Sequence, residues 1–233
     1  MVAAVTRQTQ ALLLAFLGAV LLRMSFSDDY LRYVTEWMKW PILASGVIML
    51  LLAVGPLFGD PDKVHDPEHA DHEHSGVPLA TWLLVLPGLV VFVISPPELG
   101  SFLAERRANE SAASQPKVVS DLSAEETSEV PLQEFVWRAQ SGGDTLVDRS
   151  VELTGFVTYA GDSWYVTRLT IGCCAADALA FRVRVDGADR PERDQWVRVA
   201  GSYVEGTGLS LSDDAVIDAD EVTEIAKPRQ TYE

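Results

Sequence analysis

All four histidines of this 233-residue chain fall within ten residues. They alternate with acidic residues in the segment 60–76, whose candidate metal ligands are His65, His69, His72, His74, Asp66, Glu68, Asp71 and Glu73. Neutral imidazole binds zinc, copper, nickel or cobalt, and carboxylates can complete the coordination shell. The spacing lacks the fixed pattern of a closed structural zinc site. The segment therefore predicts labile binding of Zn²⁺ or another divalent transition metal, with a solvated acidic loop as the alternative.

The only two cysteines, Cys173 and Cys174, are adjacent, and Asp177 follows them. A bond between adjacent cysteines would be a strained vicinal disulfide. One interpretation is that both are small, buried, apolar side chains at a tight junction between strands. The other is a thiolate pair that binds a soft metal, together with Asp177, or undergoes redox chemistry. No histidine follows residue 130, so a thiol metal site there would be short of ligands.

No catalytic set can be assembled in the C-terminal hundred residues. Ser-His-Asp and Cys-His arrangements need a histidine, and the acidic residues are scattered rather than paired. A phosphate-binding glycine loop is also absent from the sequence. We therefore expect a protein that is not an enzyme, and no motif indicates a small-molecule substrate.

Charge and hydropathy are concentrated in different parts of the chain. The formal net charge is −16, yet 48% of the residues are hydrophobic and the mean hydropathy is +0.10. Residues 1–59 carry four basic and three acidic residues, whereas residues 131–233 carry ten basic and eighteen acidic residues. An acidic C-terminal domain is a poor match for phosphate backbones, so nucleic acid is excluded as an expected partner.

Residues 1–97 are predicted to form a membrane region with about three transmembrane helices, at 8–26, 40–58 and 77–97. The alternative for the first stretch is a signal peptide. The basic residues Arg23, Arg32, Lys39, Arg106 and Arg107 fall on one side of these spans, and Arg7 and Lys63 fall on the other. The positive-inside rule then predicts a multi-pass protein of the cell membrane, with its C-terminal domain in the cytoplasm and residues 60–76 outside.

The rest of the chain is predicted to be a linker at 98–130 and a β domain at 131–233. A short helix is expected at 132–139, followed by strands at 151–159, 163–171, 179–185, 195–204 and 216–225, with a hairpin turn at Gly161-Asp162. Five short strands in about a hundred residues favour a small five-stranded barrel of the OB type. A β-sandwich is the alternative.

Several motifs resemble the YcgQ-like family of bacterial membrane proteins, described as predicted permease subunits. The most specific is Ile171-Gly172-Cys173-Cys174-Ala175-Ala176-Asp177-Ala178, followed by Trp196-Val197-Arg198-Val199-Ala200-Gly201. Others are Trp37-Met38-Lys39-Trp40, the histidine-rich loop, Ser95-Pro96-Pro97-Glu98-Leu99-Gly100, and Thr231-Tyr232-Glu233. The family's longer histidine tracts are lacking, since this chain has four histidines.

The resemblance implies association with a larger permease encoded nearby and, in some bacteria, zinc-responsive regulation. It also implies a functional role for Cys173, Cys174 and Asp177, but no reaction and no ligand set. The first hypothesis is therefore a membrane accessory subunit that handles a divalent metal, zinc first, for a permease partner. The second is a structural or assembly protein whose β domain binds another protein. A thiol redox protein is the third.

Overall fold

The computed structural model describes residues 7–58, 100–111, 127–210 and 213–233, together with residues 83, 86, 89, 90 and 93. The chain divides into two compact units. The helical unit contains residues 1–30 and 36–97, and the β unit contains residues 31–35 and 98–233. The histidine-containing segment 60–76 and almost all of the predicted third span at 77–97 lie outside the described residues.

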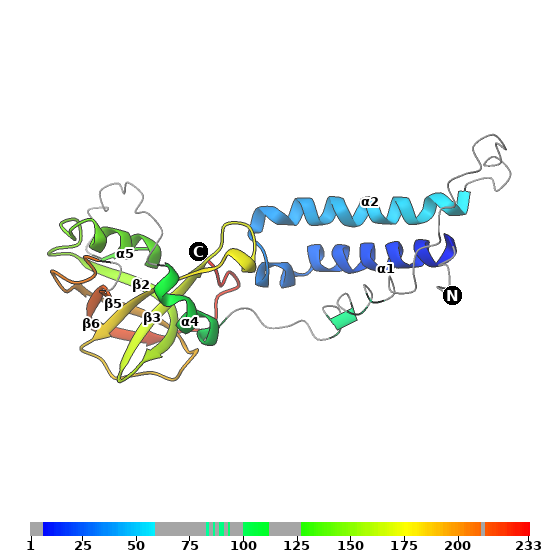
Figure 1. The fold of residues 1–233 in the computed structure, drawn as a ribbon. Coiled ribbons are helices and arrows are strands. Elements are labelled where there is room, and N and C mark those ends of the chain that lie inside the picture. Colours follow the sequence, from blue (N-terminus) through cyan, green and yellow to red (C-terminus); the bar gives the residue numbers. More distant parts are fainter. Residues whose placement is uncertain are drawn as a thin grey trace. The chain divides into compact units, whose positions relative to one another are not determined.

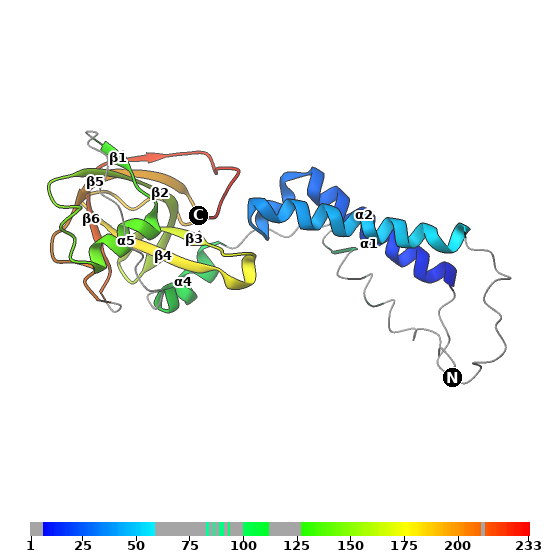
Figure 2. The ribbon, with the colours of Figure 1, turned by 90° about the horizontal axis from the view of Figure 1, so that it is seen from above.

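The helical unit contains α1 (Arg7–Phe26), η2 (Glu36–Met38) and α2 (Lys39–Phe58), with η1 (Asp28–Arg32) following α1. Helices α1 and α2 run alongside each other (Figures 1 and 2). They approach closely where two glycines meet, because a Cβ on Gly18 would lie 3.0 Å from the carbonyl oxygen of Gly46. Small residues at a helix contact allow this backbone approach, which is a common way for membrane helices to pack.

One helical stretch among the described residues, Glu36–Val54, is long and apolar enough to cross a membrane. A shorter apolar stretch, Gln10–Phe26, accompanies it. Large apolar side chains on α2 are exposed, including Leu51 at 67%. Core helices of soluble proteins and signal sequences pass the same length and composition test. The multi-pass topology therefore stays a prediction.

The β unit confirms the strands and the short helix predicted after residue 131, with each end within one residue of its expected place. Its elements are α4 (Ser101–Ser111), β1 (Thr127–Glu129), α5 (Leu132–Gln140), β2 (Ser150–Ala160), β3 (Ser163–Thr170), η5 (Ala175–Asp177), β4 (Leu179–Asp186), β5 (Trp196–Tyr203) and β6 (Val216–Glu224). The predicted hairpin turn joins β2 to β3, and Gly161 adopts a φ of +60° there. The prediction of a plain linker at 98–130 missed α4 and β1, which lie within that range.

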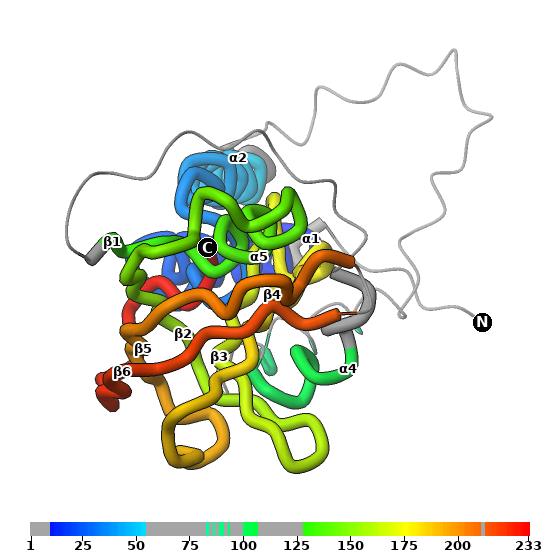
Figure 3. Tube along the Cα trace, turned by 90° about the vertical axis from the view of Figure 1, so that its left-hand side faces the viewer, coloured from blue at the N-terminus to red at the C-terminus, as the bar shows by residue number. Residues whose placement is uncertain are grey.

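In the described part of the chain, six strands form one mixed sheet in the order β1-β2-β3-β4-β6-β5. Two pairings, β1 with β2 and β4 with β6, are parallel, and the others are antiparallel. Strand β2 also pairs with β5, so the strands from β2 to β6 are joined in a continuous ring of pairings. Figure 3 shows β5 and β6 side by side across one face of this arrangement.

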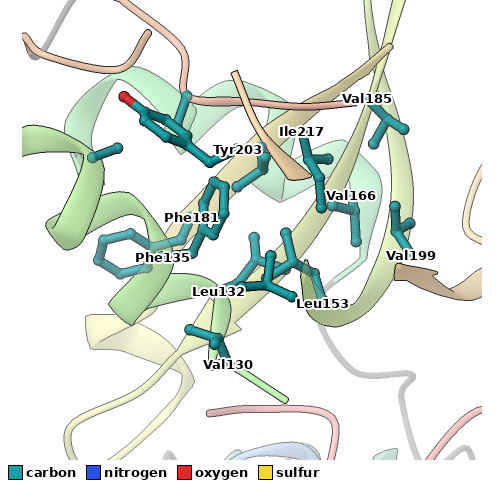
Figure 4. Packing of buried hydrophobic residues seen from close by; sticks show 14 of the residues in the cluster. Val130, Leu132, Phe135, Leu153, Val166, Phe181, Val185, Val199, Tyr203 and Ile217 are labelled. Atoms are coloured by element: carbon teal, nitrogen blue, oxygen red, sulfur yellow. The ribbon is translucent and has the colours of Figure 1, made fainter. Parts of the chain in front are cut away.

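The main core lies between α5 and the inward side chains of the strands (Figure 4). Leu132, Phe135 and Ala139 share one face of α5 and are fully buried, as expected for residues spaced three and four apart. The Phe135 ring packs edge-on against Tyr203, with centroids 5.8 Å apart. This contact joins the helix to β5 and accounts for the predicted amphipathic pattern.

Helix α4 is attached to the β unit by polar contacts with residues that lie more than fifty positions later in the sequence. The backbone N–H and the hydroxyl of Ser101 each donate a hydrogen bond to the Asp194 carboxylate, both at 2.9 Å. Glu105 accepts a hydrogen bond from the backbone N–H of Tyr159 at 3.0 Å, and Arg193 donates to the same carboxylate. The bond to Asp194 satisfies the Ser101 N–H, which lies in the first turn of α4 and has no intrahelical partner.

The last residues, 231–233, dock beside β3 and support α5. The Glu233 carboxylate accepts hydrogen bonds from the backbone N–H groups of Leu132, at 3.1 Å, and Gln133, at 3.3 Å. Burial raises the pKa of Glu233 above its ordinary value of 4.5, although these hydrogen bonds and nearby Arg168 oppose the shift. A carboxylate at the start of a helix is favourable, but its desolvation is costly.

Glu233→Gln is expected to change how stability depends on pH. Because the folded-state pKa is raised, the folded chain holds this proton more tightly than the unfolded chain. The contribution is fully present below pH 4.5 and is lost as pH rises through the folded-state pKa. The unfolding free energy of the natural chain minus that of the variant should therefore fall above pH 4.5, by at most about 1.4 kcal/mol per pH unit. Thermal unfolding of both proteins from about pH 4 to about pH 8, which covers the carboxyl titration, measures this difference. A difference that stays flat or rises would contradict it.

Candidate thiol site

The two cysteines lie in the loop that joins β3 to β4, which we call the thiol loop (Ile171–Ala178). Cys173 is exposed and Cys174 is half-buried, and neither forms a disulfide. Their sulfur atoms are 3.5 Å apart, with the Cys173 thiol as donor. The interpretation of both as buried apolar side chains is therefore wrong, because the loop turns the Cys173 side chain toward solvent.

Asp177 organises the backbone of the thiol loop. Its carboxylate accepts hydrogen bonds from the backbone N–H groups of Gly172 at 3.1 Å, Cys173 at 2.9 Å and Cys174 at 3.4 Å. In return, the Cys174 sulfur accepts the backbone N–H of Asp177. This reciprocal pattern is a capping box at the start of η5, with a cysteine in the place usually taken by serine or threonine.

These contacts shift the pKa values of Asp177 and Cys173 in opposite directions. Desolvation tends to raise the pKa of Asp177, but the hydrogen bonds from the backbone of Cys173, Gly172 and Cys174 outweigh it, so the pKa lies below its ordinary value. The pKa of Cys173 is raised to about 11, first by its hydrogen bond to Cys174 and then by Asp177. Cys173 is therefore a protonated thiol near neutral pH. Reactive redox cysteines show the opposite shift.

The loop has a geometry that suits a thiophilic ion. Cys173, Cys174 and Asp177 each offer one ligand atom, and these atoms lie within 4.8 Å of one another. Zinc–sulfur bonds of about 2.3 Å in a tetrahedral site place two sulfurs roughly 3.8 Å apart, close to the 3.5 Å between these two. Each carboxylate oxygen has two lone pairs, so Asp177 can accept its hydrogen bonds from the backbone and also coordinate an ion. Three ligands leave a tetrahedral ion one open position.

The thiol loop lies inside the part of the chain that is similar to a known family. Residues 131–233 match the DUF1980 C-terminal domain. This match spans α5, the strands β2 to β6 and the thiol loop, and it supports an uncharacterised family of the DUF1980 type. No curated protein matches the chain, and no solved structure matches it.

A strand-like segment from outside the matched residues 131–233 borders the thiol loop. Residues 31–35 belong to the β unit, and Val34 forms an antiparallel bridge with Cys174. The Ala175 N–H donates to the Tyr33 carbonyl at 2.7 Å, and the Thr35 N–H donates to the Cys173 carbonyl at 3.3 Å. The Tyr232 hydroxyl donates to the Arg32 carbonyl at 2.8 Å. We call residues 31–35 the connector, because they lie between α1 and α2 in the sequence.

The structure brings together one of the two predicted ligand groups. Cys173, Cys174 and Asp177 converge within the region that matches the family model, residues 131–233. The other group, His65, His69, His72, His74, Asp66, Glu68, Asp71 and Glu73, lies outside the described residues. Sequence reasoning missed two features: the capping role of Asp177 and the connector. The three-residue spacing of Cys174 and Asp177 is that of a capping box, but the residue types differ from its usual Ser or Thr and Glu or Gln. Nothing in residues 31–35 indicates a strand partner.

Proposed function

We propose that this chain is a membrane accessory subunit that receives a divalent transition metal, Zn²⁺ first, and passes it to a permease partner. The observation that carries the proposal is the pair formed by exposed Cys173 and half-buried Cys174, whose sulfurs are 3.5 Å apart with Asp177 beside them. Thiolates select soft and borderline ions such as zinc. A site with an open coordination position can exchange its ion with another carrier, whereas a four-ligand structural site retains it.

Features of the sequence also support a metal-handling membrane subunit. The histidine and carboxylate segment at 60–76 offers a second group of zinc ligands. The apolar helix at Glu36–Val54 supports membrane attachment, and the YcgQ-like resemblance supports a permease partner. The raised pKa of Cys173, about 11, argues against a redox role and means that a metal must displace a proton to bind this sulfur.

The β domain itself is proposed to be an OB-type barrel, because the ring of pairings among β2 to β6 matches that topology. Nucleic acid is a poor candidate ligand for it. Several arginines that project from its strands are paired with carboxylates: Arg182 with Asp214, Arg184 with Asp186, and Arg198 with Glu152. A strand-binding groove would instead need basic side chains available for phosphates.

Metal titration of the full chain in detergent tests the proposal. Zn²⁺ binding, measured by competition with a chromophoric chelator, is expected to be saturable. The double variant Cys173→Ser, Cys174→Ser should weaken one site by about a hundredfold or more, since each thiolate supplies a large share of zinc affinity. The matched control is Ala175→Ser, Ala176→Ser, which alters the same loop without removing a sulfur. Replacing His65, His69, His72 and His74 with alanine tests the second ligand group.

The outcomes separate the hypotheses. If the metal stoichiometry and affinity are the same in the natural chain and in the double cysteine variant, the proposal of a thiol site is overturned. A membrane complex that assembles equally well when both the cysteines and the histidines are replaced, and that holds no metal, would favour the structural or assembly role. A permease that copurifies with bound zinc, and loses the zinc with the cysteine variant, supports the accessory subunit.

A further inference from the structure

The peptide unit between Cys173 and Cys174 is hydrogen-bonded at both ends to groups of different parts of the chain. Its carbonyl oxygen accepts the Thr35 N–H from the connector at 3.3 Å. Its N–H donates to the Asp177 carboxylate at 3.4 Å. A peptide unit is planar and rotates as one body. A movement that rotates this peptide unit therefore changes both its contact with Asp177 and its contact with Thr35.

The connector is covalently continuous with the helical unit at both ends. Tyr30 on one side and Glu36 on the other belong to the helical unit, whereas the residues between them belong to the β unit. The connector is held in the β unit by the bridge from Val34 to Cys174, by the Ala175 N–H on the Tyr33 carbonyl, and by the Tyr232 hydroxyl on the Arg32 carbonyl. The stretch that receives these bonds therefore also joins α1 to α2.

We infer that bridging of Cys173 and Cys174 by a thiophilic ligand strengthens the backbone pairing between the thiol loop and the connector. Ligand binding to the thiols is thereby coupled to the stability of the segment that joins α1 and α2. The inference rests on the proposed function for the identity of the natural ligand, a divalent metal ion. The two side chains are joined by one sulfur–sulfur hydrogen bond of 3.5 Å. A single ion or atom bound to both sulfurs removes side-chain freedom from the two residues whose backbone pairs with the connector.

Thermodynamic reciprocity gives the inference a second consequence. If ligand binding strengthens the pairing of the connector by some factor, then disrupting that pairing must weaken ligand binding by the same factor. Couplings of this kind usually amount to roughly fivefold or more. The two effects can be measured separately, one on the connector and one on the affinity of the thiols.

Hydrogen exchange of the full chain in detergent, read by mass spectrometry, measures the first effect. Two probes are used: Cd²⁺, and phenylarsine oxide, in which the arsenic bonds both sulfurs while two thiol protons and the oxide leave as one water molecule. Each probe should slow exchange in peptides covering residues 31–35 by about fivefold or more. Peptides from α5 should not change. The Cys173→Ser, Cys174→Ser variant should abolish the response.

Thr35→Pro measures the reciprocal effect, because proline lacks the N–H that binds the Cys173 carbonyl. Its affinity for Cd²⁺ should fall by about fivefold or more relative to Thr35→Ala, which keeps that N–H. Tyr232→Phe, which removes the hydroxyl that donates to the Arg32 carbonyl, should weaken affinity less. It serves as the milder variant if Thr35→Pro disturbs exchange in the strands.

The two probes distinguish failure of this inference from failure of the proposed function. If both probes are shown to bind the thiols and neither changes the rate of hydrogen exchange in the connector, the inference is overturned and the metal proposal stands. A response to phenylarsine oxide, with no binding of Zn²⁺ or Cd²⁺ to the cysteines, supports the coupling and overturns the metal proposal. Equal affinities of Thr35→Pro and Thr35→Ala would overturn the inference.

Discussion

Replacing Gly201 with alanine is expected to destabilise the β unit by about 3 kcal/mol. Gly201 lies in β5, between β2 and β6, where it pairs with Val151 on one side and Ala219 on the other. The register of β5 against β6 shifts between Ala200 and Gly201. A Cβ at residue 201 would lie 2.1 Å from the Asp218 carbonyl oxygen and 2.9 Å from the Cα of Ala219. Both are backbone atoms, so the strands themselves must separate.

Hydrogen exchange of the full chain measures this loss. Amides of β2 and β5 that exchange by global unfolding should do so about a hundredfold faster in Gly201→Ala. Gly161→Ala is the matched control, because a Cβ at that hairpin turn meets nothing within 4 Å. Its cost, about 1 kcal/mol, comes only from placing alanine at a φ of +60°. Equal exchange in the two variants would show that the bulge accommodates a methyl group.

Replacing Asp177 with alanine is expected to make Cys173 more reactive. Asp177 contributes to the raised pKa of Cys173, about 11, through a hydrogen bond and through its charge. Without the carboxylate, the pKa should fall toward the ordinary value of 9.0, although the larger influence of Cys174 remains. The thiolate fraction at mildly alkaline pH, and with it the rate of alkylation by iodoacetamide, should rise by up to about tenfold for each unit of pKa.

Two further variants identify the cause. Asp177→Asn removes the charge but keeps one oxygen that can accept a backbone N–H, so it should raise the alkylation rate less than alanine does. Asp162→Asn, at the β2–β3 turn, should leave the rate unchanged. Alkylation that is as slow in Asp177→Ala as in the natural chain would mean that the carboxylate does not keep Cys173 protonated. The pH at which the rate is half-maximal gives the pKa directly.

The strands were predictable because their side chains alternate. In β5, Val197 and Val199 are buried while Arg198 between them is exposed, which is the period-two pattern visible in the sequence. The helix α4 carried no comparable signal. Phe102 is 71% exposed, and polar contacts that hold α4 come from Tyr159, Arg193 and Asp194, more than fifty residues later. Partners that distant leave no local pattern.

Strand β1 was missed for a different reason. It has three residues, Thr127–Glu129, and it pairs with β2 through its backbone. Backbone pairing does not depend on side-chain type, so a segment this short leaves no periodicity to detect.

The candidate site was predictable in its residues but not in its exposure. The types and spacing of Cys173, Cys174 and Asp177 indicated a thiolate group, and they do converge. Small buried side chains were an equally reasonable expectation, because free cysteine is among the residue types most often buried. The three hydrogen bonds that the Asp177 carboxylate accepts from backbone N–H groups determine the shape of the loop. Such a network depends on backbone angles that the residue types alone do not specify.

The assignment of residues 31–35 to the β unit makes residues 36–97 an insertion within a discontinuous domain. A fragment that begins at residue 98 would consequently lack one piece of its own fold. The carbonyl of Cys173 and the N–H of Ala175, which pair with Thr35 and Tyr33, would become an unprotected edge available to another chain. Excising the domain at the limits of its family match, residues 131–233, would also remove α4. Studies of the thiol chemistry therefore need the chain from before Leu31 onward.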